Sequence, residues 1–386
     1  MDHPAKIYLI GASVRWPAQS LHQARQRGEI GGRTRIIAVD SFGDQDTLEH
    51  SDDWHPIDDS KPVGDGFVIA AGGHPRVLNW LNQSTSPSRA AWEFVEDRMN
   101  YPSLVQRTGF KLPPTPLIAT EDSKHRWLLK SAKSSGGLGI VDAPLEQSAE
   151  ALSFRDNTND HLEAWIPGRR WGASFFSDGR RAILQGVCRS LIHHAEDLPF
   201  LYAGSYGPCN VTSSMQRTLS KLGNQVVERS QLQGGFGIDF LETRSNELFL
   251  LEINPRLTAS MELIELAQET SFIQRILATS TDQLTGNAIK PNFPIPTARS
   301  PHWYKRVIYG SASGNIAPSR LAKIERRLDG TRWRLADLPS RVTKVDRSTP
   351  ICTLIETGKS LANLAKSGWQ RRAIVREIQS LIDRIA

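Results

Sequence analysis

This sequence lacks three features, and each absence argues against a class of protein. No run of apolar residues approaches the roughly 20 that a membrane-spanning helix needs. The three cysteines, Cys188, Cys209 and Cys352, form no CxxC pair and have no histidine at zinc-binding spacing, which argues against a disulfide framework and a structural zinc site. The N-terminal segment has no signal-peptide cleavage region. We therefore expect a cytoplasmic protein with reduced cysteines and no membrane partner.

A strong charge of one sign is also missing. The 47 lysines and arginines exceed the 41 acidic residues by only six, and the basic residues are scattered among the acidic ones. The tightest clusters, Arg169-Arg170 and Arg371-Arg372, are short. This pattern predicts a solvated basic surface and no nucleic-acid partner, although an anionic nucleotide could still be held.

The chain begins with a βαβ pattern. The apolar segments 6–10 and 35–40 flank a glycine turn and a polar stretch, and a third apolar run follows at 66–73. Asp40 ends the second segment, where a carboxylate can bind a ribose hydroxyl in a dinucleotide site. The turn reads GASVRWPA, however, and lacks the second and third glycines of GxGxxG. We favour a plain parallel-sheet scaffold and keep a nucleotide-cofactor oxidoreductase as an alternative.

Two proline-rich segments, 112–119 and 290–301, are typical of domain boundaries, and a chain of 386 residues predicts two or three domains. The region from about 90 to 110 is predicted to be helical, and one basic amphipathic helix is predicted at 359–385. Strands are predicted at 126–130, 171–176, 182–187, 236–242, 248–253, 303–309 and 351–356.

The segment 235–256, GFGIDFLETRSNELFLLEINPR, carries the strongest functional signal. Two strands closed around Ser245-Asn246 would place Asp239 directly opposite Glu252, with Asn254 on the same face. The other face of this hairpin is then expected to enter the core through Ile238, Phe240, Leu251 and Ile253.

Two carboxylates that face each other repel, at a cost of up to about 1 kcal/mol, and a divalent cation removes that cost. Oxygen donors of Asp, Glu and Asn suit magnesium. Pro255 keeps Asn254 extended, and Arg256 follows as a fixed cation that can hold a phosphate or a carboxylate. We favour a magnesium site over an exposed hairpin with two solvated acids.

Two weaker patterns precede the hairpin. Lys130 ends an apolar strand and is followed by a Ser/Gly-rich loop whose backbone N–H groups can surround phosphates, although GxxxxGK[ST] is absent. Further on, Glu163 and Ile166 precede a Pro-Gly turn, where a connector between two lobes can offer backbone groups to an adenine.

These three elements, in this order, resemble the ATP-grasp superfamily over roughly residues 90–275. The resemblance implies that Asp239, Glu252 and Asn254 bind Mg²⁺, with Mn²⁺ as a substitute, and that Arg256 and Lys130 act in catalysis. It also implies an ATP site. Its residues would be Lys130, Ser134, Ser135, Gly136, Gly137 and Gly139 at the phosphates, and Glu163, Ala164 and Ile166 at the adenine.

The sequence departs from the family pattern at two places. The family usually supplies a second ATP-binding lysine at the start of the lid, where this chain has Asp97-Arg98. Some members carry a ribose-binding acid seven residues after the adenine-site glutamate, where this chain has Arg170.

The resemblance implies an α/β (α+β) fold of three parts. A Rossmann-like pre-ATP-grasp domain is expected at 1–90, a two-lobed ATP-grasp domain at 91–288 with its lid at roughly 115–165, and a small C-terminal α+β extension at 289–386. More narrowly, the sequence is similar to uncharacterised ATP-grasp proteins of methanopterin- and methanofuran-linked one-carbon metabolism, which are related to a tyramine:glutamate ligase.

The activity that the resemblance implies is ligation. An ATP-dependent carboxylate-amine ligase would activate a small carboxylate as an acyl phosphate for attack by an amine, in cofactor biosynthesis, and such enzymes can form homo-oligomers. Besides the oxidoreductase, a non-catalytic or regulatory ATP-binding protein is the second alternative.

Overall fold

The computed structural model describes residues 4–58, 66–82, 85–115, 126–131, 135–143, 160–195, 198–285 and 300–384. Helices and strands alternate along these residues, which confirms the predicted mixed α/β class. In the part of the chain that is described, no helix is long and apolar enough to cross a membrane.

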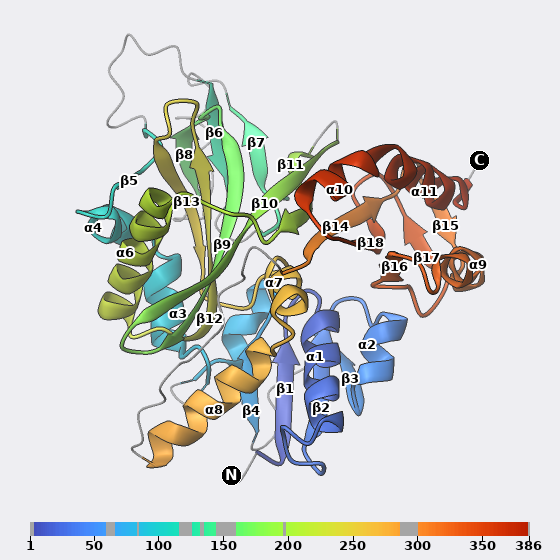
Figure 1. The fold of residues 1–386 in the computed structure, drawn as a ribbon, viewed down its shortest axis with the longest axis horizontal. Helices are drawn as coiled ribbons and strands as arrows, with labels where there is room; N and C mark the ends of the chain where they lie inside the picture. Colours follow the sequence, from blue (N-terminus) through green and yellow to red (C-terminus); the bar gives the residue numbers. More distant parts are fainter. Residues whose placement is uncertain are drawn as a thin grey trace.

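The N-terminal unit is a parallel sheet of four strands in the order β3-β2-β1-β4 (Figure 1). Strands β1 and β2 are buried along almost their whole length, because parallel strands are covered on both faces and therefore consist of continuous apolar runs. The elements are β1 Lys6–Ile10, α1 Arg15–Gln26, β2 Arg35–Asp40, α2 Gln45–His50, β3 Asp53–Pro56, β4 Phe67–Ala70 and the 3-10 helix Pro75–Trp80.

A sheet of nine strands forms the body, in the order β16-β18-β14-β11-β10-β9-β12-β13-β5. It runs without interruption from the 235–256 hairpin into strands near the C-terminus, which occupy the right of Figure 1. Its strands are β5 Phe110–Lys111, β9 Arg169–Asp178, β10 Ala182–Ala195, β11 Leu198–Gly207, β12 Gln233–Glu242, β13 Leu248–Asn254, β14 His302–Tyr309, β16 Trp333–Ala336 and β18 Pro350–Gly358.

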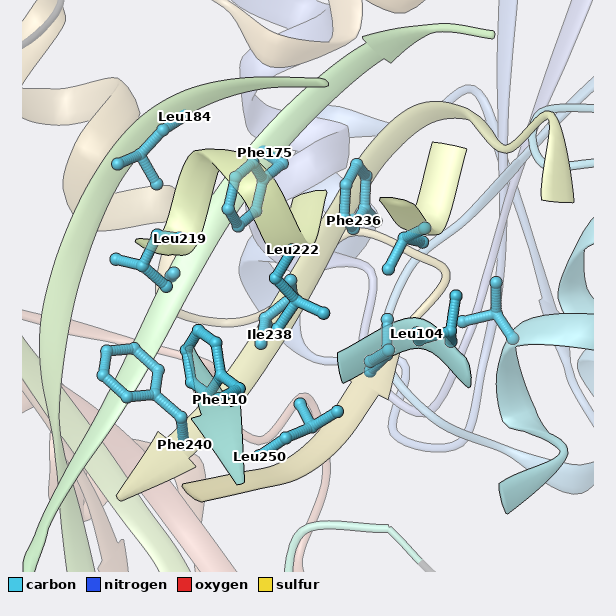
Figure 2. Close-up of a cluster of buried hydrophobic side chains, with 14 of the residues drawn as sticks. Leu104, Phe110, Phe175, Leu184, Leu219, Leu222, Phe236, Ile238, Phe240 and Leu250 are labelled. Atoms are coloured by element: carbon cyan, nitrogen blue, oxygen red, sulfur yellow. The ribbon is translucent and has the colours of Figure 1, made fainter. Parts of the chain in front are cut away.

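One face of this sheet packs against α6 (Ser213–Ser230), α3 (Arg89–Glu96) and α4 (Tyr101–Val105). Leu219 and Leu222 of α6 meet strand residues such as Phe175 and Phe236, whose rings stack with centroids 5.0 Å apart (Figure 2). Helix α6 is amphipathic, and its N-cap Thr212 accepts a hydrogen bond from the Met215 N–H. Because this face is filled by apolar side chains, the polar residues of β12 and β13 lie on the opposite face.

The predicted register of the 235–256 hairpin is confirmed at Asp239 and is wrong from Phe240 to the turn. Asp239 lies opposite Glu252, as predicted, but the next pair is Phe240 with Leu250, so Leu251 is the extra residue of a β-bulge. Leu250 is therefore fully buried in the core, whereas Leu251 is only half-buried. The prediction that Leu251 enters the core was wrong, because one inserted residue exchanges the two faces of a strand.

A separate three-stranded sheet, β7-β6-β8, stands at the top of Figure 1. It consists of β6 Trp127–Lys130, β7 Ile140–Asp142 and β8 His161–Ala164. The loop from β6 to β7 carries the predicted phosphate-binding residues, of which Ser134 lies outside the described part of the chain.

The C-terminal region differs from its prediction. Where one helix was expected at 359–385, the chain forms α10 (Leu361–Lys366), α11 (Gly368–Ser380) and the short strand β19 (Asp383–Arg384). Ser367 separates the helices because its hydroxyl donates to the buried Glu356 carboxylate, which holds the chain at that point. The remaining elements are the 3-10 helix Arg98–Asn100, α7 Met261–Gln268, α8 Phe272–Thr285, β15 Gly314–Ile316, α9 Pro318–Leu328 and β17 Thr343–Val345.

Candidate functional site

Two carboxylates face each other across β12 and β13. Asp239 is half-buried, and burial together with the nearby Glu252 carboxylate raises its pKa to about 7. On the neighbouring strand Gly172 leaves room, since a β-carbon there would lie 3.2 Å from Asp239 Oδ1. This end of the hairpin therefore holds two acids side by side, and the small residue at 172 leaves the Asp239 carboxylate uncovered by a side chain from that strand.

Asn254 and Arg256 extend this pair of acids. The Asn254 amide donates to Asp239 Oδ2 at 3.2 Å, and its carbonyl oxygen accepts from Arg256 Nη2 at 2.7 Å. Asp239, Asn254 and Arg256 thus form one hydrogen-bonded chain, and Glu252 lies opposite Asp239. Arg256 keeps further N–H donors for a phosphate or carboxylate.

The donors in this chain suit a hard cation such as Mg²⁺. Two facing carboxylates and an amide oxygen with a free lone pair supply oxygen ligands, and a cation would remove the repulsion between the acids. Within the described residues, no three His, Cys, Asp or Glu side chains gather into a metal-binding group. Magnesium needs few protein ligands, because phosphate oxygens and water complete its shell, so two carboxylates fit.

Lys130 and Glu163 form a second cluster. Both are buried, they come from the paired strands β6 and β8, and the Lys130 ammonium forms an ion pair with Glu163 Oε1. Burial lowers the pKa of Lys130, which Glu163 opposes. Burial acts to raise the pKa of Glu163, but Lys130, His161 and Arg98 outweigh it and lower that pKa to about 2. Glu163 is thus ionised and holds the lysine in place.

Arg98 joins the two clusters, and it is the functional residue that the sequence patterns missed. Its Nη1 donates to Glu163 Oε2 at 3.1 Å, and its Nη2 donates to the carbonyl oxygen of Leu251 at 2.7 Å. That carbonyl belongs to the bulge next to Glu252. The available signal was a cation at the position where the family usually has a lysine.

The predicted adenine-binding segment follows Glu163 directly. The Ala164 N–H donates to the Pro114 carbonyl at 2.8 Å, so it is not available to a ligand. The Ile166 N–H has no hydrogen bond to any residue that the structure describes. A base at this connector would therefore meet the Ile166 N–H as a donor.

Arg170 takes the place of the expected ribose-binding acid. Arg170 pairs with Leu241 of β12, which is two residues from Asp239. Because side chains alternate between the two faces of a strand, Arg170 lies on the same face of the sheet as Asp239. Its guanidinium covers the Phe200 ring at 5.0 Å, and burial lowers its pKa while Asp239 and Glu163 oppose that shift. A cation here faces both acidic clusters.

The glycine loop is docked against the body and the N-terminal unit. Gly136 O accepts from the Tyr202 N–H of β11 at 2.8 Å, and a β-carbon at Gly137 would lie 2.0 Å from the Phe200 carbonyl oxygen. Ser135 Oγ donates to Gly73 O at 3.0 Å. Glycine is therefore required at 137, which also has a positive φ of 84°.

Gly73 brings the loop next to the hairpin. A β-carbon at Gly73 would lie 2.6 Å from the Ser135 β-carbon and 2.8 Å from Arg256 Nη2. The structure therefore gathers Ser135, Arg256, Asn254 and Asp239 at one place. Gly139 ends the same loop, where its carbonyl accepts from the Ser131 N–H at 2.9 Å.

Asp40, by contrast, is structural. It is fully buried, and its carboxylate accepts hydrogen bonds from the Val14, Phe42 and Gly43 N–H groups and from the Trp54 indole. Because this carboxyl group is fully buried and already accepts four hydrogen bonds from the protein, it is not exposed to a ribose hydroxyl, which argues against the oxidoreductase alternative.

Comparisons with known proteins agree with this geometry. Residues 95–260 match the ATP-grasp domain family. The chain is 22% identical over 302 residues to an uncharacterised protein of Methanocaldococcus jannaschii, a match that covers 75% of this chain and 68% of the relative.

Solved structures show a similar fold over the whole chain. An ADP complex of N5-carboxyaminoimidazole ribonucleotide synthetase superposes with a TM-score of 0.65 at 14% identity, covering 99% of both chains. An L-amino acid ligase of Bacillus licheniformis superposes with a TM-score of 0.64 at 12% identity, covering 100% of both. Residues 95–260 therefore match an ATP-grasp domain, and the chain as a whole shares the fold of these two solved structures.

Proposed function

We propose that this protein is an ATP- and Mg²⁺-dependent ligase that activates a small carboxylate for attack by an amine. The facing pair Asp239 and Glu252, tied through Asn254 to Arg256, is the observation that carries the proposal. A paired-acid site with an arginine beside it matches what phosphoryl transfer to a carboxylate requires.

The chemistry takes two steps. A carboxylate oxygen of the substrate attacks the γ-phosphorus of ATP, the bond from that phosphorus to the β,γ-bridging oxygen breaks, and ADP leaves. The amine nitrogen then attacks the acyl carbon, the bond to the phosphate oxygen breaks, and an amide forms with release of inorganic phosphate and a proton. Bound Mg²⁺ would supply neutralisation of the phosphate oxygens.

The protein's own residues contribute position and charge. Lys130 and Arg256 supply two fixed cations, and we assign the phosphates of ATP to them and to the loop residues Ser134, Ser135, Gly136, Gly137 and Gly139. Asp239, Glu252 and Asn254 would hold Mg²⁺. The Ile166 N–H and the Ala164 carbonyl would meet the adenine, while Glu163 orients Lys130 and Arg98. The docked loop would keep water from the acyl phosphate.

The domain boundaries predicted above, 1–90, 91–288 and 289–386, are carried into this proposal. The ATP site would lie between the lid and the body, and small-molecule substrates would reach it from the N-terminal side. The narrower prediction, a step in methanofuran- or methanopterin-type cofactor synthesis, stays a prediction, and homo-oligomer formation and Mn²⁺ substitution likewise stay predictions.

The test is ADP release from purified protein with MgATP and paired libraries of carboxylates and amines, with mass analysis of any product. Glu252→Gln should lower turnover at least 100-fold. Glu247→Gln is the matched control, because that exposed acid lies on the same hairpin and pairs with Lys111, away from the site.

Two results would contradict the proposal. Magnesium-dependent turnover retained by Glu252→Gln would remove the metal assignment. Tight MgATP binding with no ADP release across the libraries would favour the regulatory ATP-binding protein instead.

A further inference from the structure

A cavity of about 500 Å³ lies between the N-terminal unit and the C-terminal strands of the large sheet. The turns after β1 and β2 form one wall, including Ser13 and Phe42, and β14 and β18 form another. Gly72 and Ala259 also line it. Gly72 N–H donates to Leu257 O at 3.1 Å, so the cavity begins beside the loop that carries Arg256.

Six charged residues line the cavity, and two of them, Arg341 and Lys344, are exposed. The other four are less exposed, and all but one of these are already paired with a described residue. Arg15 is 2% exposed and binds Glu262 and Asp337, and Lys305 is 5% exposed and donates to Glu262 Oε2 at 2.7 Å. Asp46, behind the wall, accepts from the Asp337 N–H at 2.8 Å. These groups hold the N-terminal unit, α7 and the C-terminal strands together and need no ligand.

Asp44 is the exception. It lines the cavity and is only 8% exposed, yet its carboxyl group has no hydrogen bond or ion pair with any described residue. Thr353 of β18 lines the same cavity, is 2% exposed, and its hydroxyl likewise has no described partner. A buried carboxyl without a partner is unfavourable, and proteins tolerate such groups chiefly where a ligand binds.

The groups around Asp44 make its charge more costly. Burial and the neighbouring acids raise its pKa to about 9. Arg15, which opposes this shift, is already shared among other acids. The titratable and charged groups that act on the Asp44 carboxyl come from several elements. They are Asp40 of β2, Arg15 of α1, Asp46 of α2, Cys352 of β18, and Asp337, which follows β16. An incoming positive charge is the missing partner.

The rest of the wall is largely apolar. Around Asp44 the cavity is lined by Trp16, Phe42, Val307, Tyr309, Ile316 and Ile351. Such a wall suits a hydrocarbon or aromatic body and excludes a ligand that is polar all round.

We propose that this cavity binds the amine substrate, with its ammonium group on Asp44 and Thr353 and an apolar body against the surrounding side chains. This inference rests on the proposed function, because it names the second substrate of that reaction. Gly72 in the cavity wall donates to Leu257 O, next to Arg256 along the chain, so a bound amine would lie close to the loop that carries Arg256.

The test is calorimetric titration of the full-length protein with 2-phenylethylamine and, as its uncharged match, 2-phenylethanol. The amine should bind, Asp44→Asn should weaken it at least tenfold, and the alcohol should bind no better to the wild type than to the variant. Glu49→Gln is the control, because this exposed acid lies on the same short helix, accepts a hydrogen bond from Gln45 and does not line the cavity. It should leave the affinity unchanged.

Two further readouts exclude a merely structural Asp44. Asp44→Asn should not lower the free energy of unfolding at pH 7.5, since the carboxyl it removes has no partner. At that pH amine binding should release a proton from Asp44, seen as a dependence of the binding heat on the buffer in the wild type and not in the variant.

The outcomes separate this inference from the proposed function. Three results would overturn the inference and leave the proposed ATP chemistry unaffected. These are MgATP binding without amine binding, equal amine affinity in the wild type and Asp44→Asn, and binding of the alcohol as tight as that of the amine. Asp44-dependent amine binding with no MgATP binding would support the pocket and overturn the ligase.

Discussion

Glu262 and Asp239 both carry a carboxylate into the protein, but only Glu262 is paired with cations. Arg15 Nη2 and Lys305 Nζ donate to Glu262 Oε2 at 2.9 and 2.7 Å. Burial acts to raise the pKa of Glu262, but the two cations outweigh it and hold that pKa far below its ordinary value. Asp239 receives one amide hydrogen bond, from Asn254, and faces the Glu252 carboxylate.

This contrast separates structural acids from binding acids. A buried acid that pairs with two cations holds the fold together, since removing it would leave buried positive charge with less counter-charge. Two acids that face each other, such as Asp239 and Glu252, repel when no cation is bound, so the pair favours binding of a cation. Asp44 belongs with Asp239 in this respect, although it lines the cavity next to the N-terminal unit.

Glu262→Gln should have the largest effect on stability. It removes the carboxylate that pairs with Lys305 and one of the carboxylates that pair with Arg15, both of which are buried, so we expect the free energy of unfolding to fall by about 3–5 kcal/mol. Denaturant unfolding measures this. Glu265→Gln is a control from the same helix, because burial raises the pKa of that acid to about 7 and it has no direct ion pair among the described residues. Equal losses in both variants would erase the distinction between the two kinds of acid.

The pH dependence of the Glu262 variant sharpens the same point. Because the folded-state pKa of Glu262 lies below its ordinary 4.5, its contribution is present above pH 4.5 and is lost as the pH falls further. The wild type should therefore lose more stability than Glu262→Gln between pH 5 and pH 3. Parallel stability curves would contradict the assignment.

Arg98→Ala should have an intermediate effect, on the ATP site. It removes the bridge from Glu163 to the Leu251 carbonyl, and we expect the KM for ATP to rise about 10- to 100-fold with little change in the fold. Arg98→Lys keeps the charge and should recover part of this loss. Steady-state kinetics distinguish the two, and an unchanged KM in Arg98→Ala would remove Arg98 from the site.

Asp239→Asn should have the smallest effect on stability and the opposite sign. Removing one of two facing charges should raise the free energy of unfolding of the metal-free protein by up to about 1 kcal/mol. The same variant should lose the stabilisation that MgCl₂ gives the wild type. Thermal unfolding with and without MgCl₂ is the measurement, and a destabilised variant that still responds to MgCl₂ would contradict a binding role.

Much of the hairpin could be predicted because it depends on local alternation. Asp239 opposite Glu252 follows from the period of two and one turn position, and the structure has this pair. The bulge at Leu251 could not be predicted, since an unpaired residue leaves the apolar pattern readable in either register. Strand β11 was not predicted either, because its GSYG segment lacks a run of β-branched residues.

The sequence by itself determined the βαβ start, the alternating hairpin and the order of three elements that resembles ATP-grasp proteins. Only the tertiary structure decided which charges meet. Arg15 and Glu262 are 247 residues apart, and Arg98 and Glu163 are 65 apart. Periodicity is a property of neighbours along the chain, whereas ion pairs and the unpaired Asp44 depend on how distant elements pack, so they become visible only in the folded protein.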